Sequence, residues 1–404
     1  MRRSLQFRLA GSSPSVEQSV RPASSVDRLP ALDGIRGLAI IWVVLHNTTD
    51  HLPPTLHGAS HMLAFLVHPG WIGVQLFFAL SGFLITGSLL DTQRATNYFR
   101  AFYARRALRI LPLYYTVLIL LLIVAPELQL GPTSLKANLK EQLSLWLFVV
   151  NWTDAAPYGF AHFWSLAIEE QFYLFWPFIV YRLSARRLFT VCLCIAAFAL
   201  VMRGIMVCSG ASSWTVYTAT TSRLDALTLG GAGACLVRIP ATRAWLASRF
   251  SAVNLAALAL FVVGVPITRT YNTDAIPGQI FGYTLLAICC ATLVTSAASA
   301  DKEAKSTFLT RVLRSKPLRS WGKYSYAIYI FHQLIHKLWG EPWLLSRFSS
   351  HPPALAVYAY SLTIGLVSFG AAYLSYHLLE KRFLALKSLV RPHMPNQAHG
   401  SAMP

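Results

Sequence analysis

Long apolar runs, separated by short basic stretches, repeat along nearly the whole chain. A helix needs about 20 mostly apolar residues to cross the hydrocarbon core of a bilayer, at a rise of about 1.5 Å per residue. Runs close to that length lie at about residues 34–50, 70–90, 109–125, 163–182, 188–207, 222–237, 252–268, 279–299, 324–340 and 354–378. The pattern therefore predicts an all-α fold, a polytopic membrane helical bundle of about ten transmembrane helices.

One further apolar stretch, at about 141–152 (QLSLWLFVVNWT), is short, and the predicted topology depends on it. If it does not cross, both termini and most basic loops fall on one side, and the loops of the other side hold only Lys136, Lys140, Arg269 and Arg347. Cytoplasmic loops carry an excess of Lys and Arg. We therefore predict a multi-pass protein of the cell inner membrane with cytoplasmic termini, and a re-entrant or interfacial segment at 141–152 on the outer side.

The composition agrees with a membrane protein. Only 13% of the 404 residues are charged and 55% are hydrophobic, whereas soluble domains carry about 25% charged residues. The net charge of +19 comes from basic residues that flank the apolar runs, so we expect no nucleic-acid partner. The six cysteines lie in or beside apolar segments without a CxxC pair, which predicts buried thiols.

The two ends of the chain differ from the apolar middle. Residues 1–27 are rich in Ser and Arg and lack the apolar core of a signal peptide, which predicts a disordered cytosolic tail. The predicted membrane domain occupies residues 28–385, and residues 386–404 form a second cytosolic tail.

Several proton-active or charged side chains interrupt the predicted spans, where a charge costs about 2.5–3.5 kcal/mol on insertion scales. Arg36 and His46 share the first span, Glu169 and Glu170 lie in the fourth, and His332 lies in the ninth. Counting along the helices puts His46, the glutamates and His332 at similar depths. A shared cavity would then bring them together as an acid–base centre.

Each of these groups also has a structural interpretation. A histidine in a span can hydrogen-bond a neighbouring helix, and the two glutamates can pair with Arg223. His332 and His336 have the spacing of metal ligands on one helix face, but no third ligand accompanies them, so we predict no metal site.

Five arginines fall between the second and third predicted spans, at positions 94, 100, 105, 106 and 109. Such a cluster is an ordinary determinant of topology. Arg106 and Arg109, however, are three residues apart at the predicted start of a helix and so point the same way. Arginine forks beside a helix N-terminus suit phosphate. The chain has no GxSxG, Walker or dinucleotide-binding motif that would indicate another chemistry.

Several segments, in the same order, resemble the acyltransferase-3 family. They are ALDGIRGLAIIWVVLHN (31–47), GWIGVQLFFALSGFLI (70–85), YARRALRILPLYY (103–115), FWSLAIEEQFYLFWP (163–177), SRLDALTLGG (222–231), YSYAIYIFHQ (324–333) and YHLLEKRF (376–383). The resemblance extends over about residues 28–385, and it is specific because the segments keep their order.

The resemblance implies ten membrane helices. It also implies transfer of an acyl group, usually acetyl, from cytosolic acyl-CoA to a carbohydrate hydroxyl at the outer side. Arg36 and His46 match the family's Arg–His motif, in which the histidine is catalytic, and Glu169 matches the carboxylate of WSLxxE. Nine residues separate Arg36 from His46, whereas the family usually has ten, so Asn47 stands at the usual position. That offset turns the imidazole by about 100° around the helix.

From these matches we expect specific roles for the candidate residues. Arg105, Arg106 and Arg109 would bind the CoA phosphates, the latter two matching the family's Arg-x-x-Arg. His46 would take the acceptor proton or carry the acyl group transiently, Glu169 would orient the imidazole or the substrate, and Arg36 would line the inner entrance. The predicted substrate-binding residues are Glu170, Arg223, Asp225, His332 and Tyr173.

The expected partners are acyl-CoA as donor substrate, a carbohydrate or glycoconjugate acceptor and the lipid bilayer, with no permanently bound cofactor. The acceptor stays open, because O-antigen, exopolysaccharide, peptidoglycan, glucan and antibiotic sugars all fit. A non-catalytic membrane carrier or exporter of a polar substrate is the alternative, since intramembrane polar residues also form substrate and proton paths.

The predicted topology is testable by cysteine labelling. In a variant without native cysteines, a cysteine at position 184 is expected to react with a membrane-impermeant reagent only from the cytoplasmic side. Labelling of that position from the outer side would contradict the ten-span topology.

Overall fold

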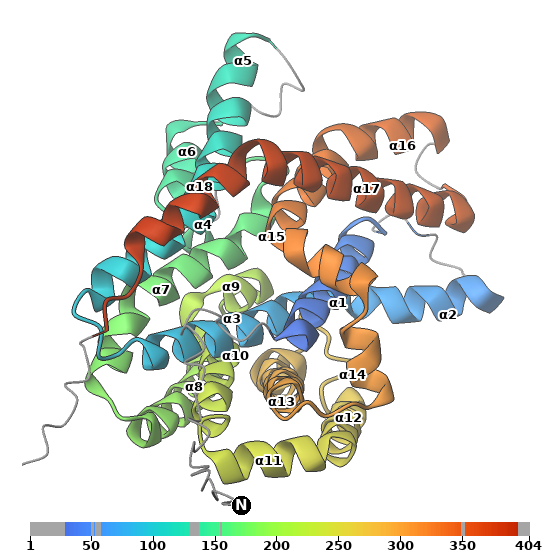
Figure 1. Ribbon diagram of the computed structural model, residues 1–404. Helices are drawn as coiled ribbons and strands as arrows, with labels where there is room; N and C mark the ends of the chain where they lie inside the picture. Colours follow the sequence, from blue (N-terminus) through green and yellow to red (C-terminus); the bar gives the residue numbers. More distant parts are fainter. Residues whose placement is uncertain are drawn as a thin grey trace, which may run out of the picture.

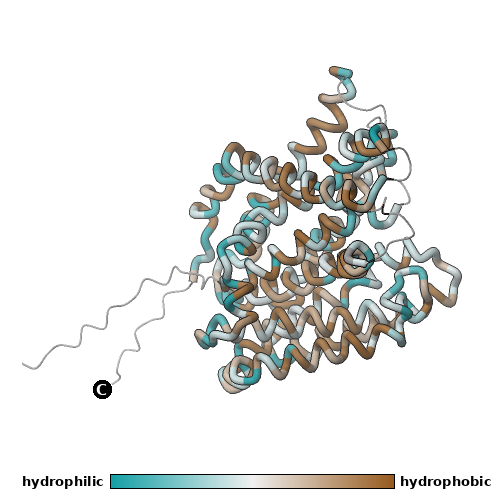
Figure 2. Tube along the Cα trace, turned by 90° about the vertical axis from the view of Figure 1, so that its right-hand side faces the viewer, coloured by the Kyte–Doolittle hydropathy of each residue, from teal (hydrophilic) through white to brown (hydrophobic). Residues whose placement is uncertain are grey.

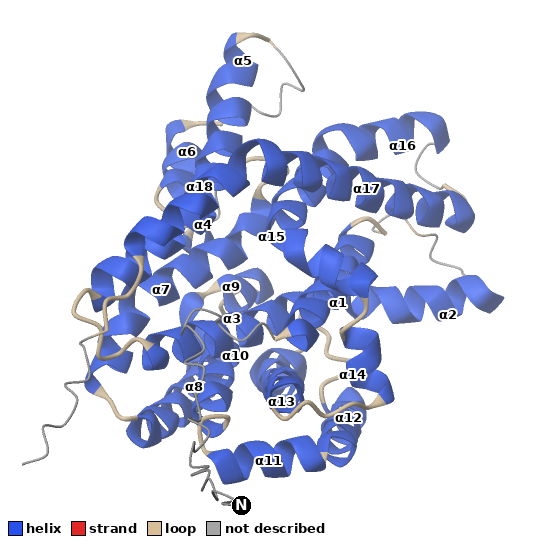
Figure 3. Ribbon diagram, in the orientation of Figure 1, coloured by secondary structure: helices blue, strands red, loops and turns tan. Residues whose placement is uncertain are grey.

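In the part of the chain that the computed structural model describes, residues 29–49, 52, 58–129, 137–153, 156–348 and 352–394, every regular element is a helix (Figure 3). The predicted tail at 1–27 lies outside the described residues, and so does the 395–404 part of the C-terminal tail. The α-helices are α1 (Pro30–Asn47), α2 (Gly58–Val67), α3 (Ile72–Asp91), α4 (Tyr98–Ile119), α5 (Ala125–Glu127), α6 (Leu139–Trp146), α7 (Trp164–Arg182), α8 (Ala185–Cys208), α9 (Ser213–Thr218), α10 (Thr220–Leu236), α11 (Pro240–Ser248), α12 (Phe250–Ile267), α13 (Tyr283–Lys302), α14 (Phe308–Leu313), α15 (Lys316–Ile335), α16 (Glu341–Phe348), α17 (Ala354–Ser375) and α18 (Lys381–Ala385).

Among the described residues, six helices are long and apolar enough to cross a membrane. They are Ser60–Asp91, Tyr98–Glu127, Ala185–Cys208, Phe250–Ile267, Gly278–Lys302 and Ala354–Val390, and a bent pair at Ser213–Leu236 and Pro240–Ser248 raises the number to seven. The predicted number of about ten is therefore not confirmed. The other three predicted spans form α1, α7 and α15, which are not among these helices.

The stretch at 141–152 forms no long helix. It contains most of α6 and a 3-10 turn at Val150–Trp152. The eight residues of α6 reach about 12 Å, well short of a hydrocarbon core of about 30 Å. The hydroxyls of Tyr114 and Tyr115 in α4 donate to the carbonyls of Leu145 and Trp146, which ties this segment to the bundle.

The helices form an inner group, made of α3 and the helices α1, α10 and α13 packed against it, and a periphery that includes α8 and α12 (Figure 1). The apolar part of the span containing α3 is 78% buried, whereas that of α12 is 11% buried and that of α8 is 22% buried. Hydrophobic residues lie along most of the helices, and hydrophilic ones gather toward the two edges where many of them end (Figure 2). The exposed apolar faces of α8 and α12 are suited to contact lipid, while α3 packs against α10, α13 and α1.

Two helix crossings inside this group are close enough to require glycine. At the contact of α1 with α15, a Cβ atom on Gly322 would lie 1.8 Å from the carbonyl oxygen of Asp33. At the contact of α3 with α10, a Cβ atom on Gly82 would lie 1.7 Å from the carbonyl oxygen of Leu227. Small residues permit such close approach between membrane helices, and a Cβ atom on Gly230 of α10 would likewise lie 2.1 Å from the carbonyl oxygen of Ala79.

The close crossing of α1 and α15 predicts that a larger residue at Gly322 destabilises the protein. Gly322→Ala is expected to destabilise the protein by about 1–3 kcal/mol, because the added methyl group must push two backbones apart. Gly370→Ala in α17 is the matched control, since a Cβ atom there meets nothing within 4 Å. Thermal unfolding in detergent measures both, and equal midpoints for the two variants would contradict the close crossing.

Candidate functional site

Three cavities follow one another through the inner group of helices. The arginine cavity, of about 110 Å³, is lined by Ser88, Thr92, Ala101, Phe102, Arg105, Arg106, Arg109, Lys387 and Pro392. The middle cavity, of about 100 Å³, is lined by residues of α1, α3, α4, α7 and α15, including Arg36, Ser81, Glu169, Glu170 and Tyr173. The histidine cavity, of about 760 Å³, is lined by residues that include His46, Asn47, His68, His162, Trp214 and Gln333.

Shared wall residues give the order of these cavities. Arg106 and Arg109 line both the arginine cavity and the middle cavity. Val74 and Tyr329 line both the middle cavity and the histidine cavity. The middle cavity therefore lies between a cationic cavity and a larger cavity with histidines in its wall.

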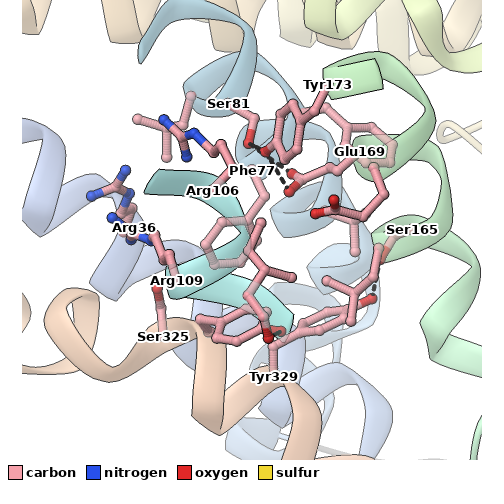
Figure 4. Close-up of a pocket in the computed structure, with 17 residues that line it drawn as sticks. Arg36, Phe77, Ser81, Arg106, Arg109, Ser165, Glu169, Tyr173, Ser325 and Tyr329 are labelled. Carbon is pink, nitrogen blue, oxygen red and sulfur yellow. Dashed lines mark hydrogen bonds between the residues drawn. The ribbon is translucent and has the colours of Figure 1, made fainter. Parts of the chain in front are cut away.

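Polar groups of opposite charge face each other across the middle cavity. Figure 4 shows the guanidinium groups of Arg36, Arg106 and Arg109 on one side and the carboxylate of Glu169 on the other. The hydroxyls of Ser81 and Tyr173 donate to Glu169 over 2.9 and 2.8 Å. The oxygens of these two hydroxyls also lie 2.7 Å apart, but each hydroxyl has a single proton, which it donates to the carboxylate.

The arginines of α4 occupy a different position in their helix from the one expected. The helix begins at Tyr98, so Arg106 and Arg109 lie more than two turns inside it. The expectation that they stand at a helix start, in a loop before the third span, is therefore wrong. Their three-residue spacing still places them on one face, and the Arg106 guanidinium lies 5.5 Å from the ring centroid of Tyr173.

His46 and Glu169 do not lie in the same cavity. His46 lines the histidine cavity, whereas Glu169 and Glu170 line the middle cavity. The Glu169 side chain is bound by Ser81 of α3 and by Tyr173 one turn further along α7. A meeting of these groups in one cavity is therefore not confirmed, and a role of Glu169 in orienting the imidazole or the substrate stays a prediction.

The histidine cavity combines imidazoles with aromatic and amide groups. The rings of His46 and His68 meet edge to face, with centroids 6.2 Å apart. Trp71, Trp164, Trp214 and Tyr217 supply aromatic walls, and residues 270–274, which include Asp274, supply polar ones. This mixture of flat apolar surfaces and hydrogen-bonding groups can accept a polar molecule with exposed C–H faces.

Asn47 lines the histidine cavity and also contacts His332. The Nδ2 atom of Asn47 lies 3.0 Å from Nε2 of the imidazole, and Nδ1 lies 2.7 Å from the carbonyl oxygen of Tyr329. A carbonyl oxygen only accepts, so Nδ1 carries the proton and Nε2 accepts from the Asn47 amide. His332 is fully buried and lines none of the three cavities, contrary to its expected place in a substrate site.

Arg223 and Asp225 also lie outside the three cavities, so the structure does not place them in the predicted substrate site. The Arg223 guanidinium is fully buried among aromatic rings, with Tyr283 at 4.4 Å and Tyr217 at 4.9 Å, and it makes no ion pair with the glutamates of α7. Asp225 forms a buried ion pair of 2.9 Å with Arg203 of α8. Both side chains are fully buried in the packing between helices.

Two histidines of the large cavity were not identified from the sequence. His68 lies just before α3 and His162 just before α7, so both fall outside the spans predicted at 70–90 and 163–182 and neither was counted as a polar residue inside a span. Burial, together with the nearby His332, lowers the pKa of His162 well below its usual value. Ser81 was missed because a lone serine in a span is common, and only its contact with Glu169 identifies it.

The described residues contain no group of three or more His, Cys, Asp or Glu side chains that could hold a metal ion. His336 is bound instead by the hydroxyl of Tyr360, with its Nδ1 atom 2.6 Å from that oxygen. The two histidines of HQLIH therefore make separate contacts. His332 is bound by Asn47, and His336 is bound by Tyr360 of α17.

Comparison with known proteins gives one family and several distant relatives. A family model described as an acyltransferase domain matches residues 29–373. The chain is 27% identical over 335 residues to the peptidoglycan O-acetyltransferase OatA of Listeria monocytogenes, covering 75% of this chain and 49% of that protein. It is 28% identical over 374 residues to the putative peptidoglycan O-acetyltransferase YrhL of Bacillus subtilis, covering 87% and 54%. The O-acetyltransferase OatA of Staphylococcus aureus is 26% identical over 375 residues, covering 87% and 56%.

The chain spans about half the length of these curated relatives. No solved structure is significantly similar to it.

Proposed function

Because this chain belongs to the acyltransferase-3 family, we propose that it is an integral-membrane O-acyltransferase. It transfers an acyl group, in our proposal acetyl, from cytosolic acyl-CoA to a hydroxyl of a carbohydrate or glycoconjugate at the outer side of the inner membrane. The observation that carries this proposal is the order of the cavities. Arg106 and Arg109 line both the arginine cavity and the middle cavity, and Tyr329 lines both the middle cavity and the one that His46 lines.

The arginine cavity is the proposed donor end. CoA carries a pyrophosphate and a ribose phosphate, and arginine forks bind phosphate oxygens through two hydrogen bonds. The basic residues gathered at one side of the predicted topology support a cytosolic position for this cavity. Arg105, Arg106 and Arg109 are the residues proposed to bind the donor phosphates.

The middle cavity is the proposed passage for the pantetheine arm of the donor. At about 100 Å³ it is too small for a sugar ring together with its solvent, but it suits a narrow chain. The amide groups of that arm need hydrogen-bond partners inside the membrane. Glu170, Tyr173 and Ser81 are the proposed partners, and Arg36 lines the wall opposite the carboxylates.

The histidine cavity is the proposed acceptor end. Its volume of about 760 Å³ lies within the range of small-molecule sites, and its aromatic walls suit the C–H faces of a sugar. The relatives' names support a sugar of peptidoglycan as the first acceptor to test.

His46 is the proposed base. It takes the proton from the acceptor hydroxyl while that oxygen attacks the thioester carbonyl, so that a C–O bond forms and the C–S bond breaks. The proton then passes from the imidazole to the CoA thiolate, and the histidine returns to its neutral form. An imidazole suits this step because it binds and releases protons near neutral pH.

A membrane carrier remains the alternative, and one measurement separates the two functions. A transferase releases free CoA from acetyl-CoA when purified protein and acceptor are mixed in detergent, whereas a carrier leaves the thioester intact. Absence of any acceptor-dependent or hydrolytic release of CoA would overturn the proposed function.

His46→Ala is expected to lower acceptor acetylation by at least about 10²–10⁴-fold, as is usual when a general base is removed. Asn47→Ala is expected to be milder, because the Asn47 amide contacts the buried His332. Both variants should remain monodisperse in detergent. The opposite ranking would show that Asn47 occupies the catalytic position, and full activity in both would move the centre away from α1.

Arg106→Ala and Arg109→Ala are each expected to raise the KM for acetyl-CoA without loss of insertion or folding. Arg106→Lys should restore only part of the affinity, because a point charge replaces a planar fork. Direct binding of CoA to the purified variants measures this effect. Binding as tight as that of the unmodified protein would assign these arginines to topology alone.

A further inference from the structure

The arginine cavity brings together four cations and no carboxylate. Arg105, Arg106 and Arg109 come from α4, and Lys387 comes from a 3-10 helix at Leu386–Val390. Among the described residues, none of the four makes an ion pair with an acidic side chain. Like charges held this close repel one another, and a polyanionic ligand relieves that repulsion.

The four cations divide into two pairs by position. Arg106 and Arg109 line both the arginine cavity and the middle cavity, whereas Arg105 and Lys387 line only the arginine cavity. A ligand that reaches from the arginine cavity into the middle cavity therefore meets Arg105 and Lys387 at its outermost end.

The backbone after Lys387 is tied to the start of α4. Asn97 donates from Nδ2 to the carbonyl oxygen of Arg391 over 2.9 Å and accepts at Oδ1 from the backbone N–H of His393 over 2.8 Å. The backbone N–H of Thr96 donates to the carbonyl oxygen of His393 over 3.0 Å. These bonds fix residues 391–393 beside the cavity that Pro392 helps to line.

The hydrogen bonds of Asn97 indicate that the attachment of residues 391–393 to α4 is specific. Asn97 stands at the N-cap of α4, where an asparagine side chain usually accepts a hydrogen bond from its own helix. Here it makes no such bond, and both ends of its amide bind the C-terminal segment instead. The 3-10 helix also limits how Lys387 can be oriented. Leu389 is 77% exposed and suited to lipid, while Lys387 lines the cavity.

We propose that Lys387, together with Arg105, binds the 3′-phosphate of the CoA donor, and that residues 386–393 are part of the donor site. The assignment rests on the proposed function and follows from the shape of CoA. Pantetheine in the middle cavity places the pyrophosphate next to Arg106 and Arg109, and the phosphate on the ribose lies beyond it. The segment expected to be a simple cytosolic tail thus completes the site.

The test compares binding of CoA with binding of 3′-dephospho-CoA to the full chain in lipid nanodiscs. The unmodified protein is expected to prefer CoA by about tenfold, the scale of one charge-assisted hydrogen bond. Lys387→Gln should remove most of that preference by weakening CoA alone. Lys381→Gln in α18 is the matched control, because Lys381 is exposed and lines none of the three cavities.

Asn97→Ala tests whether the position of residues 391–393 contributes to the preference for CoA separately from the charge of Lys387. It keeps Lys387 but removes two of the bonds that fix residues 391–393, so it should also reduce the preference for CoA. Arg106→Ala should weaken both ligands equally and leave the preference intact. An unchanged preference in Lys387→Gln, or no preference in the unmodified protein, overturns this inference while the proposed function stands. Failure of the unmodified protein to bind either ligand overturns the proposed donor itself.

Discussion

A Cβ atom on Gly322 would lie 1.8 Å from the carbonyl oxygen of Asp33, so the backbones of α1 and α15 touch. This contact sets how closely the two helices approach each other at their crossing. It lets the Asn47 side chain reach His332 near the far end of the crossing, and it places Tyr329 of α15 between the middle and histidine cavities. The proposed path from the arginine cavity to His46 depends on this crossing, because α1 and α15 both contribute residues to the walls of the middle and histidine cavities.

Polar groups inside a membrane protein need partners within the protein, since lipid supplies none. The structure meets this need in two ways. Glu169 is bound by Ser81 and Tyr173, and Arg203 pairs with Asp225 behind the cavities. Arg105, Arg106 and Arg109 of α4, in contrast, have no acidic partner among the described residues and line a cavity, which is the arrangement expected of a site for an anionic ligand.

The apolar runs predicted where the helices lie, because burial in lipid or among helices selects the same side chains. They did not predict how many helices are long and apolar enough to cross a membrane, since α1, α7 and α15 are not among the helices that meet this test. The spacing of Arg106 and Arg109 predicted one shared face, but the start of α4 was placed about three turns late, because a helix with several arginines in its first three turns looks like a basic loop. The directions of Glu169 and Arg223 depend on neighbours from other helices, which no local pattern contains.

The central claim is that the donor and the acceptor approach from opposite sides of the membrane through connected cavities. Proteoliposomes with the arginine-cavity side facing the lumen test it directly, with acetyl-CoA sealed inside and a peptidoglycan-derived sugar outside. The account predicts acetylated sugar outside and free CoA inside, with no transfer in liposomes that contain His46→Ala protein. Transfer only when donor and acceptor share one compartment would contradict it.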